Sequence, residues 1–72
     1  MGAIEYIDRL KVVDDMIRRR FKGNAAKLGR QIGVSRRTVF NYFETLRQWG
    51  ADIQYDHANG CFYYANSFQL KV

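Results

Sequence analysis

Residues 24–40 read NAAKLGRQIGVSRRTVF, and the Gly33-Val34-Ser35 triplet inside this stretch is the sharpest local structural signal in the chain. Gly33 is suited to the left-handed conformation that ends a helix, and Ser35 is suited to the N-cap that begins the next one. Val34 can point inward between them. Asn24 is a further N-cap, at the start of a short helix predicted over residues 25–32. The stretch therefore predicts two helices joined by a tight turn.

The helix after the turn is predicted over residues 36–49, with Gly50 as its stop. Val39, Phe43 and Leu46 follow one another at steps of four and three, which places them on one buried stripe. Tyr42 and Trp49 flank this stripe and are expected in the core. The opposite, exposed side carries Arg37, Asn41, Glu44 and Gln48, with Thr38 and Phe40 at its edges and Arg36 nearer the buried edge.

The helix before the turn contains a glycine that needs an explanation. Its inward positions are Ala25, Leu28, Gly29 and Ile32. Glycine inside a helix costs about 1 kcal/mol relative to alanine. We expect the offsetting reason to be a close crossing with the next helix, where only a very small residue lets two backbones approach.

A longer helix is predicted over residues 3–21, with Gly23 as its stop. Its buried stripe is expected to consist of Tyr6, Leu10, Val13, Ile17 and Phe21, spaced by four, three, four and four. Val12 and Met16 fall outside this stripe. They are either ordinary scatter or a narrow strip that faces a partner.

After Gly50 the apolar period changes from 3.6 to 2, which predicts a β-hairpin over residues 51–65. Ile53 and Tyr55 share one face of its first strand, and Phe62 and Tyr64 point inward from the second. Asn59-Gly60 ends the short loop between them. The chain is thus expected to form a single α+β domain over residues 1–72: a three-helix bundle followed by a two-stranded hairpin.

Composition and single residues exclude several classes of function. A chain of 72 residues with 47% apolar residues can bury a core but has little room for a substrate cleft. Cys61 is the only cysteine and His57 the only histidine, so no zinc set and no nucleophile–histidine pair exists. We expect both to be structural, Cys61 as a half-buried strand residue and His57 in the turn. We expect no enzyme activity, no cofactor and no metal. Without a signal peptide or an apolar span, the expected location is the cytoplasm, away from membranes.

The charge distribution favours a polyanionic partner. The net charge is +5, and residues 18–37 contain a block of eight basic residues and no acidic residue. A solvated face would normally mix both signs, so this block favours nucleic acid. Its eight members are Arg18, Arg19, Arg20, Lys22, Lys27, Arg30, Arg36 and Arg37.

The 24–40 stretch resembles the helix-turn-helix of DeoR-like regulators. It is most similar to the winged-helix module that precedes WYL effector domains, and it is also similar to the DNA-binding domain of the biotin repressor. Residues 46–56, LRQWGADIQYD, resemble the family's passage from recognition helix to wing. The resemblance covers about residues 4–66 and implies a bacterial transcription regulator with a winged helix-turn-helix fold. The helix over 36–49 would then enter the major groove of double-stranded DNA, and the hairpin would be the wing.

The resemblance also implies which residues touch DNA. Ser35, Arg36, Arg37 and Thr38 would contact it at the start of the recognition helix, and position 41, here Asn41, would face a base edge or a phosphate. Side-chain chemistry agrees, because arginine pairs bidentately with guanine and asparagine with adenine. Lys22, Lys27 and Arg30 are expected to flank the groove and bind the backbone. Two positions depart from the family pattern: Gly29 replaces a common alanine, and the wing lacks its usual lysines and arginines, so we expect the wing to contribute less.

One alternative belongs to another class of function, a winged helix that binds protein through Val12, Met16, Phe40 and Tyr63. The acid-free basic block favours DNA, because a protein-docking surface has no need of eight cations. Single-stranded nucleic acid is disfavoured because most aromatic residues lie on buried stripes. One recognition helix reads only a few base pairs, so a homodimer on a two-fold site is an arrangement that we also consider.

Overall fold

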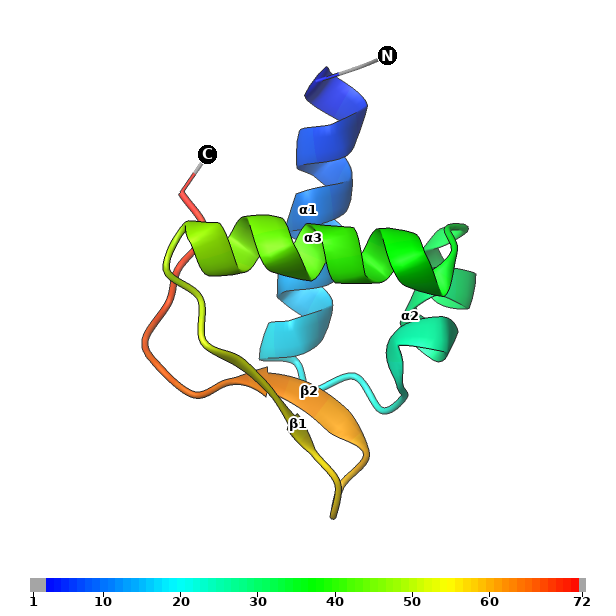
Figure 1. The fold of residues 1–72 in the computed structure, drawn as a ribbon, viewed down its shortest axis with the longest axis vertical. Coiled ribbons are helices and arrows are strands. Elements are labelled where there is room, and N and C mark those ends of the chain that lie inside the picture. Colours follow the sequence, from blue (N-terminus) through cyan, green and yellow to red (C-terminus); the bar gives the residue numbers. More distant parts are fainter. Residues whose placement is uncertain (1–2, 72) are drawn as a thin grey trace.

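The computed structural model describes residues 3–71, so residues 1, 2 and 72 of the expected domain lie outside it. Three helices precede a two-stranded antiparallel hairpin, which makes the fold an α+β winged helix-turn-helix (Figure 1). The helix α3 runs across α1, with α2 beside the start of α3 and the hairpin below. The elements are α1 (Ala3–Arg18), α2 (Ala25–Ile32), α3 (Arg36–Gln48), β1 (Ile53–Asp56) and β2 (Cys61–Tyr64). Within the described residues, no helix is both long enough and apolar enough to cross a bilayer.

The core forms where the apolar stripes of the three helices meet, and its most completely buried members are Leu10, Val13, Ile17, Leu28, Val39, Phe43 and Leu46. Three expectations about this core were wrong. Tyr6, expected on the buried stripe of α1, is 39% exposed. Met16, placed outside the α1 stripe, is only 8% exposed and belongs to the core, because α1 packs against α2 as well as α3. Trp49, expected in the core, is 47% exposed because α3 ends at Gln48, just before it.

The first helix ends three residues earlier than the predicted range 3–21. Arg20 adopts the left-handed conformation, with φ of 54°. The N–H of Phe21 then donates to the carbonyl of Met16 at 3.0 Å, and the N–H of Arg20 donates to the carbonyl of Ile17 at 3.1 Å. This pair of bonds is a Schellman motif, so α1 ends at Arg18 and the left-handed residue that terminates it is Arg20 rather than Gly23. Phe21 still packs against the core, but from the loop.

The turn between α2 and α3 forms as its sequence indicates. Asn24 caps α2, its Oδ1 accepting the Lys27 N–H at 3.0 Å. Gly33 is left-handed, with φ of 80°, and the Val34 N–H donates back to the Gly29 carbonyl at 2.8 Å. The expected reason for Gly29 needs correction. A Cβ there would lie 2.5 Å from the Val34 carbonyl oxygen, so the backbone that approaches Gly29 belongs to the turn itself rather than to α3.

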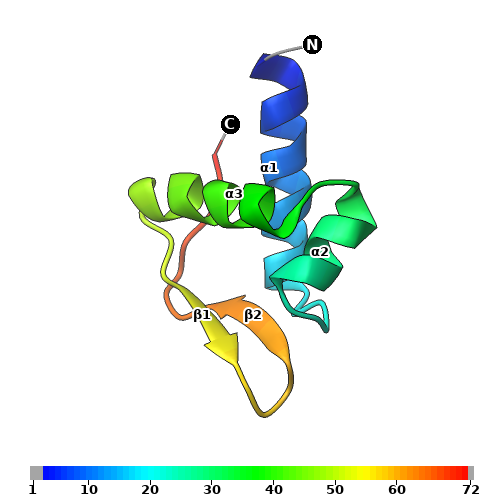
Figure 2. The ribbon, with the colours of Figure 1, turned by 45° about the vertical axis from the view of Figure 1, so that its right-hand side comes forward.

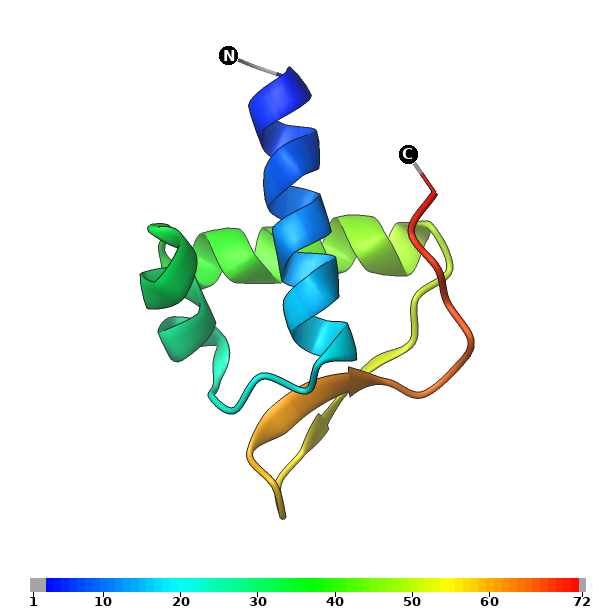
Figure 3. The ribbon, with the colours of Figure 1, turned by 180° about the vertical axis from the view of Figure 1, so that it is seen from behind.

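The hairpin pairs Ile53 with Tyr64 and Asp56 with Cys61, with residues 57–60 as its turn. Asp56 holds the turn, because its Oδ1 accepts the N–H groups of residues 58 and 59 at 3.0 and 3.2 Å. A bridge from Lys22 to Cys61 adds the segment after α1 to the other edge of β2, as the view from behind shows (Figure 3). Cys61 was expected to be half-buried but is fully buried, 2% exposed, in this middle position.

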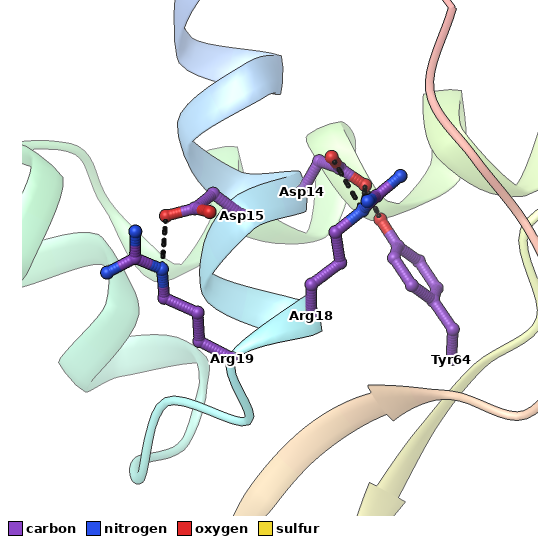
Figure 4. A network of polar contacts seen from close by, with 5 residues as sticks. All are labelled: Asp14, Asp15, Arg18, Arg19 and Tyr64. Atoms are coloured by element: carbon purple, nitrogen blue, oxygen red, sulfur yellow. Dashed lines mark hydrogen bonds and ion pairs between the residues drawn. The ribbon is translucent and has the colours of Figure 1, made fainter.

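Two polar contacts fix the hairpin to the helices. Arg47 in α3 donates through Nη2 to the carbonyl of Ile53 at 3.1 Å. The hydroxyl of Tyr64 donates to Asp14 Oδ1 of α1 at 2.6 Å (Figure 4). Asp14 is the one buried acid among the described residues. Burial, and then the bond to Asp14, raise the pKa of Tyr64, so the phenol stays protonated and remains a donor.

Candidate nucleic-acid interface

The start of α3 is built around a pair of hydroxyl groups. Ser35 caps the helix, its Oγ accepting the Thr38 N–H at 3.2 Å, and the two side-chain oxygens lie 3.0 Å apart. One of the two hydroxyl protons is used in the bond between them. The other is free to donate outward, so this pair offers one hydroxyl donor to a phosphate rather than two.

Arg37 and Asn41 both lie on the exposed side of α3, one helical turn apart. A side chain four residues further along a helix projects in nearly the same direction, so both can reach the same few base pairs. The first acid of α3 is Glu44, one turn beyond Asn41, and it lies 3.9 Å from Arg47. The N-terminal half of the helix therefore presents cationic and amide groups to solvent without a competing carboxylate of its own.

Arg36 lies at a different place, in a hollow of about 500 Å³ between the start of α2, α3 and the hairpin. It is exposed, as expected for a long side chain that extends outward from a position near the buried edge. Phe40, 45% exposed, forms part of the same hollow and meets Phe43 edge-on at 6.0 Å. Figure 2 shows the three elements around this region. The lining residues are Asn24, Ala25, Ala26, Arg36, Phe40, Tyr55 and Phe62.

The cations expected to flank the groove are spread over two elements. Lys27 and Arg30 are exposed on α2, where the Lys27 Nζ lies 5.9 Å from the centre of the Phe21 ring. Lys22 is also exposed but belongs to the segment that pairs with β2. The structure thus brings Ser35, Arg36, Arg37, Thr38 and Asn41 together on α3, with Lys27 and Arg30 on the neighbouring helix and Lys22 beside the wing.

The basic block is less uniform in space than in sequence. Arg18 Nε lies 3.2 Å from Asp14 Oδ2, and Arg19 Nε lies 3.0 Å from Asp15 Oδ2, each acid one turn earlier on α1 (Figure 4). These two arginines are therefore compensated by acids that lie just outside the block. Arg20 is placed differently, with its guanidinium carbon 5.0 Å from the centre of the Tyr63 ring.

The wing tip itself carries no cation. Residues 51–66 contain neither lysine nor arginine. His57 meets Tyr55 edge-on at 4.8 Å, and Tyr55 in turn meets Phe62 at 4.7 Å, so the turn is packed by aromatic contacts. The pKa of Asp56 is lowered, chiefly by the hydrogen bond from the Asn59 side chain. Among residues 3–71, no group of three potential metal-ligating side chains comes together.

Comparison with known proteins places this geometry in a class. A family model described as an HTH domain matches residues 15–60, which include the end of α1, the complete helix-turn-helix, β1 and the turn of the hairpin but not β2. The chain therefore belongs to this family of helix-turn-helix DNA-binding domains. No curated protein and no solved structure gives a significant match to the chain.

Proposed function

We propose that this domain binds double-stranded DNA sequence-specifically, as a bacterial transcription regulator or as the DNA-binding module of one, with α3 as its recognition helix. The observation that carries the proposal is the exposed N-terminal half of α3. Arg37 and Asn41 project together there, without an acid on that half of the helix. The likeness to DeoR-like regulators points the same way.

The residues divide by what each can recognise. Arg37 can donate two hydrogen bonds to guanine O6 and N7, and Asn41 can pair with adenine N6 and N7 in the major groove. Phosphates are the same at every position, so the cations beside the helix fix the register of the domain without reading sequence. We assign that role to Lys22, Lys27, Arg30 and Arg36, together with the free hydroxyl proton of the Ser35–Thr38 pair.

The alternative, a protein-interaction module, receives less support. Of its four expected contact residues, Met16 is buried in the core. Val12 and Phe40 are exposed but line two different hollows, one beside α1 and α2 and the other beside the wing. Tyr63 is half-buried, with Arg20 over its ring. These side chains do not form one continuous apolar surface of the kind that marks a docking site.

The test is a titration of a random-sequence duplex at several salt concentrations. If about four to six phosphates are neutralised, log K falls against log salt with a slope of about −3.6 to −5.4. Absence of binding at low salt, or a slope near zero, would contradict DNA binding. Selection from a pool of genomic oligonucleotides then gives the preferred site. A two-fold symmetric consensus would indicate a homodimer, and a single short site a monomer.

A further inference from the structure

The wing lacks cations of its own, but two cations from another segment lie against it. Lys22 pairs with Cys61 across an antiparallel bridge, and the N–H of Gly23 donates to the carbonyl of Gly60 at 2.8 Å. Directly opposed residues of paired strands project to the same face. Lys22 therefore shares a face with Cys61, and also with Tyr63, two residues further along β2.

Arg20 reaches this same face. Its guanidinium carbon lies 5.0 Å from the centre of the Tyr63 ring. An arginine stacked on an aromatic ring keeps N–H donors at the rim of its guanidinium, where they can fork onto a phosphate. The opposite face carries Phe62, which packs on Phe43 of α3 at 4.8 Å. The two cations thus occupy the face of the hairpin that is turned away from α3.

The backbone at Arg20 is in the left-handed conformation, which is unusual for a residue other than glycine. Each helix ends with a left-handed residue: α2 at Gly33, α3 at Gly50 and α1 at Arg20. Glycine adopts this conformation without steric cost, whereas an arginine is strained by it. Strain that persists in a fold is a reason to look for a function of the side chain.

The nearby Asp56 does not neutralise Arg20. The positive charge of Arg20 contributes to the lowered pKa of Asp56, so the two groups sense one another. Among the described residues, however, no ion pair within 4.0 Å involves Arg20, and both oxygens of Asp56 already accept bonds from the turn. The guanidinium donors remain available to an external anion.

We infer that Arg20 and Lys22 supply the phosphate contact of this wing, on the face of the hairpin opposite to α3. The inference rests on the proposed duplex binding. A hairpin that enters the minor groove, which is only about 6 Å wide, has one phosphate backbone on each side. Arg36 faces the hollow on the α3 side, and Arg20 with Lys22 face the other strand.

The experiment measures salt slopes on a fluorescein-labelled random duplex of about two helical turns, ~20 bp. Lys22→Gln and Arg20→Gly should each reduce the magnitude of the slope by about 0.9, one phosphate contact. Glycine at position 20 suits the left-handed backbone, so the fold should persist, which a thermal melt checks. Arg20→Lys keeps the charge and should keep the slope.

Arg19→Gln is the matched control, since Arg19 is the adjacent residue but pairs with Asp15. It should leave the slope unchanged. The inference is overturned if the wild type shows the expected slope while Arg20→Gly and Lys22→Gln do not alter it. It is also overturned if Arg19→Gln lowers the slope as much as Arg20→Gly does. A wild-type domain that does not bind at all contradicts the proposed function itself, so the two failures are distinguishable.

Discussion

Replacing Gly29 by alanine tests the geometry of the helix-turn-helix most sharply. Gly29 lies within α2 and is buried, and an added methyl group would lie 2.5 Å from the Val34 carbonyl oxygen and 3.2 Å from Ser35 backbone atoms. Ordinary contacts begin at 3.4 Å. The turn would have to move outward, which strains the 2.8 Å bond between Val34 and Gly29 and shifts the Ser35 cap.

Two opposing effects set the magnitude of the change. Alanine in place of glycine gains about 1 kcal/mol of helix propensity. Overpacking typically costs about 1–3 kcal/mol, and here it falls toward the upper end because the obstructing atoms are backbone. We therefore expect Gly29→Ala to lower the free energy of unfolding by about 1–2 kcal/mol. For a domain of this size, each kcal/mol corresponds to about 4–8 °C in melting temperature.

The assay is urea and thermal unfolding followed by circular dichroism. Gln31→Ala, at an exposed position of the same helix, is the matched control and should change stability by no more than about 0.5 kcal/mol. Gly29→Leu should destabilise more than Gly29→Ala. An alanine variant as stable as the wild type, or more stable, would refute the reasoning, because it would mean that the turn does not close over Gly29.

Two further predictions concern the hairpin. Tyr64→Phe removes the 2.6 Å hydrogen bond to Asp14. It should lower the free energy of unfolding by about 1.5–3 kcal/mol, as expected for a hydrogen bond to a charged group. A denaturant titration measures this change, with Tyr55→Phe as the control. The pKa of Tyr64 is raised above 10.0, so the stabilisation that the bond provides should be complete below pH 10.0 and decline as the pH rises further. If the difference in unfolding free energy between wild type and Tyr64→Phe does not change with pH across that range, the result argues against the bond. Asp56→Ala should speed hydrogen exchange at the amides of Ala58 and Asn59 while leaving core amides protected. Because the pKa of Asp56 is lowered, this turn should be ordered above pH 3.8 and loosen as the pH falls below it. Unchanged hydrogen exchange in Asp56→Ala would show that the carboxylate does not hold the turn.

The sequence predicted the helices and the hairpin well because local chemistry and periodicity agree there. No tertiary information is needed to predict the buried stripe of Val39, Phe43 and Leu46, or the caps around Gly33. The end of α1 could not be predicted in the same way. Phe21 continues the apolar spacing, yet it reaches the core from a loop, and arginine at position 20 gives no sign of a positive φ. Periodicity does not distinguish a helical residue from a loop residue that packs against the same core.

Other differences arise from contacts between elements. Met16 is buried because α1 meets two helices, which requires a wider apolar face than one stripe. The crowding at Gly29 comes from a turn that folds back, which spacing within α2 does not reveal. The pairing of Arg18 with Asp14 and of Arg19 with Asp15 is different, since the spacing of four is visible in the sequence. The charge pattern of residues 18–37 alone does not reveal these pairs, because both acids lie before that block.

The candidate site also has features that the sequence predicts and features that depend on contacts between distant elements. Arg37 and Asn41 share a helix face by geometry alone, so their proximity was predictable. The hollow beside Arg36 was not, because it is formed by three elements that are distant in sequence. Nor was the placement of Lys22 and Arg20 beside β2, which depends on how the α1–α2 connection pairs with the hairpin.

The most direct measurement compares binding of variants to the selected site and to a scrambled duplex at several salt concentrations. Arg37→Ala and Asn41→Ala should each cost about 1–3 kcal/mol on the selected site and much less on the scrambled one, because base-edge bonds form only with the right sequence. Lys27→Ala and Arg30→Ala should weaken binding to both duplexes alike and reduce the salt slope by about one unit per phosphate lost. If Arg37→Ala and Asn41→Ala weaken both duplexes equally, these residues do not read bases, and α3 is not the recognition helix in the sense proposed.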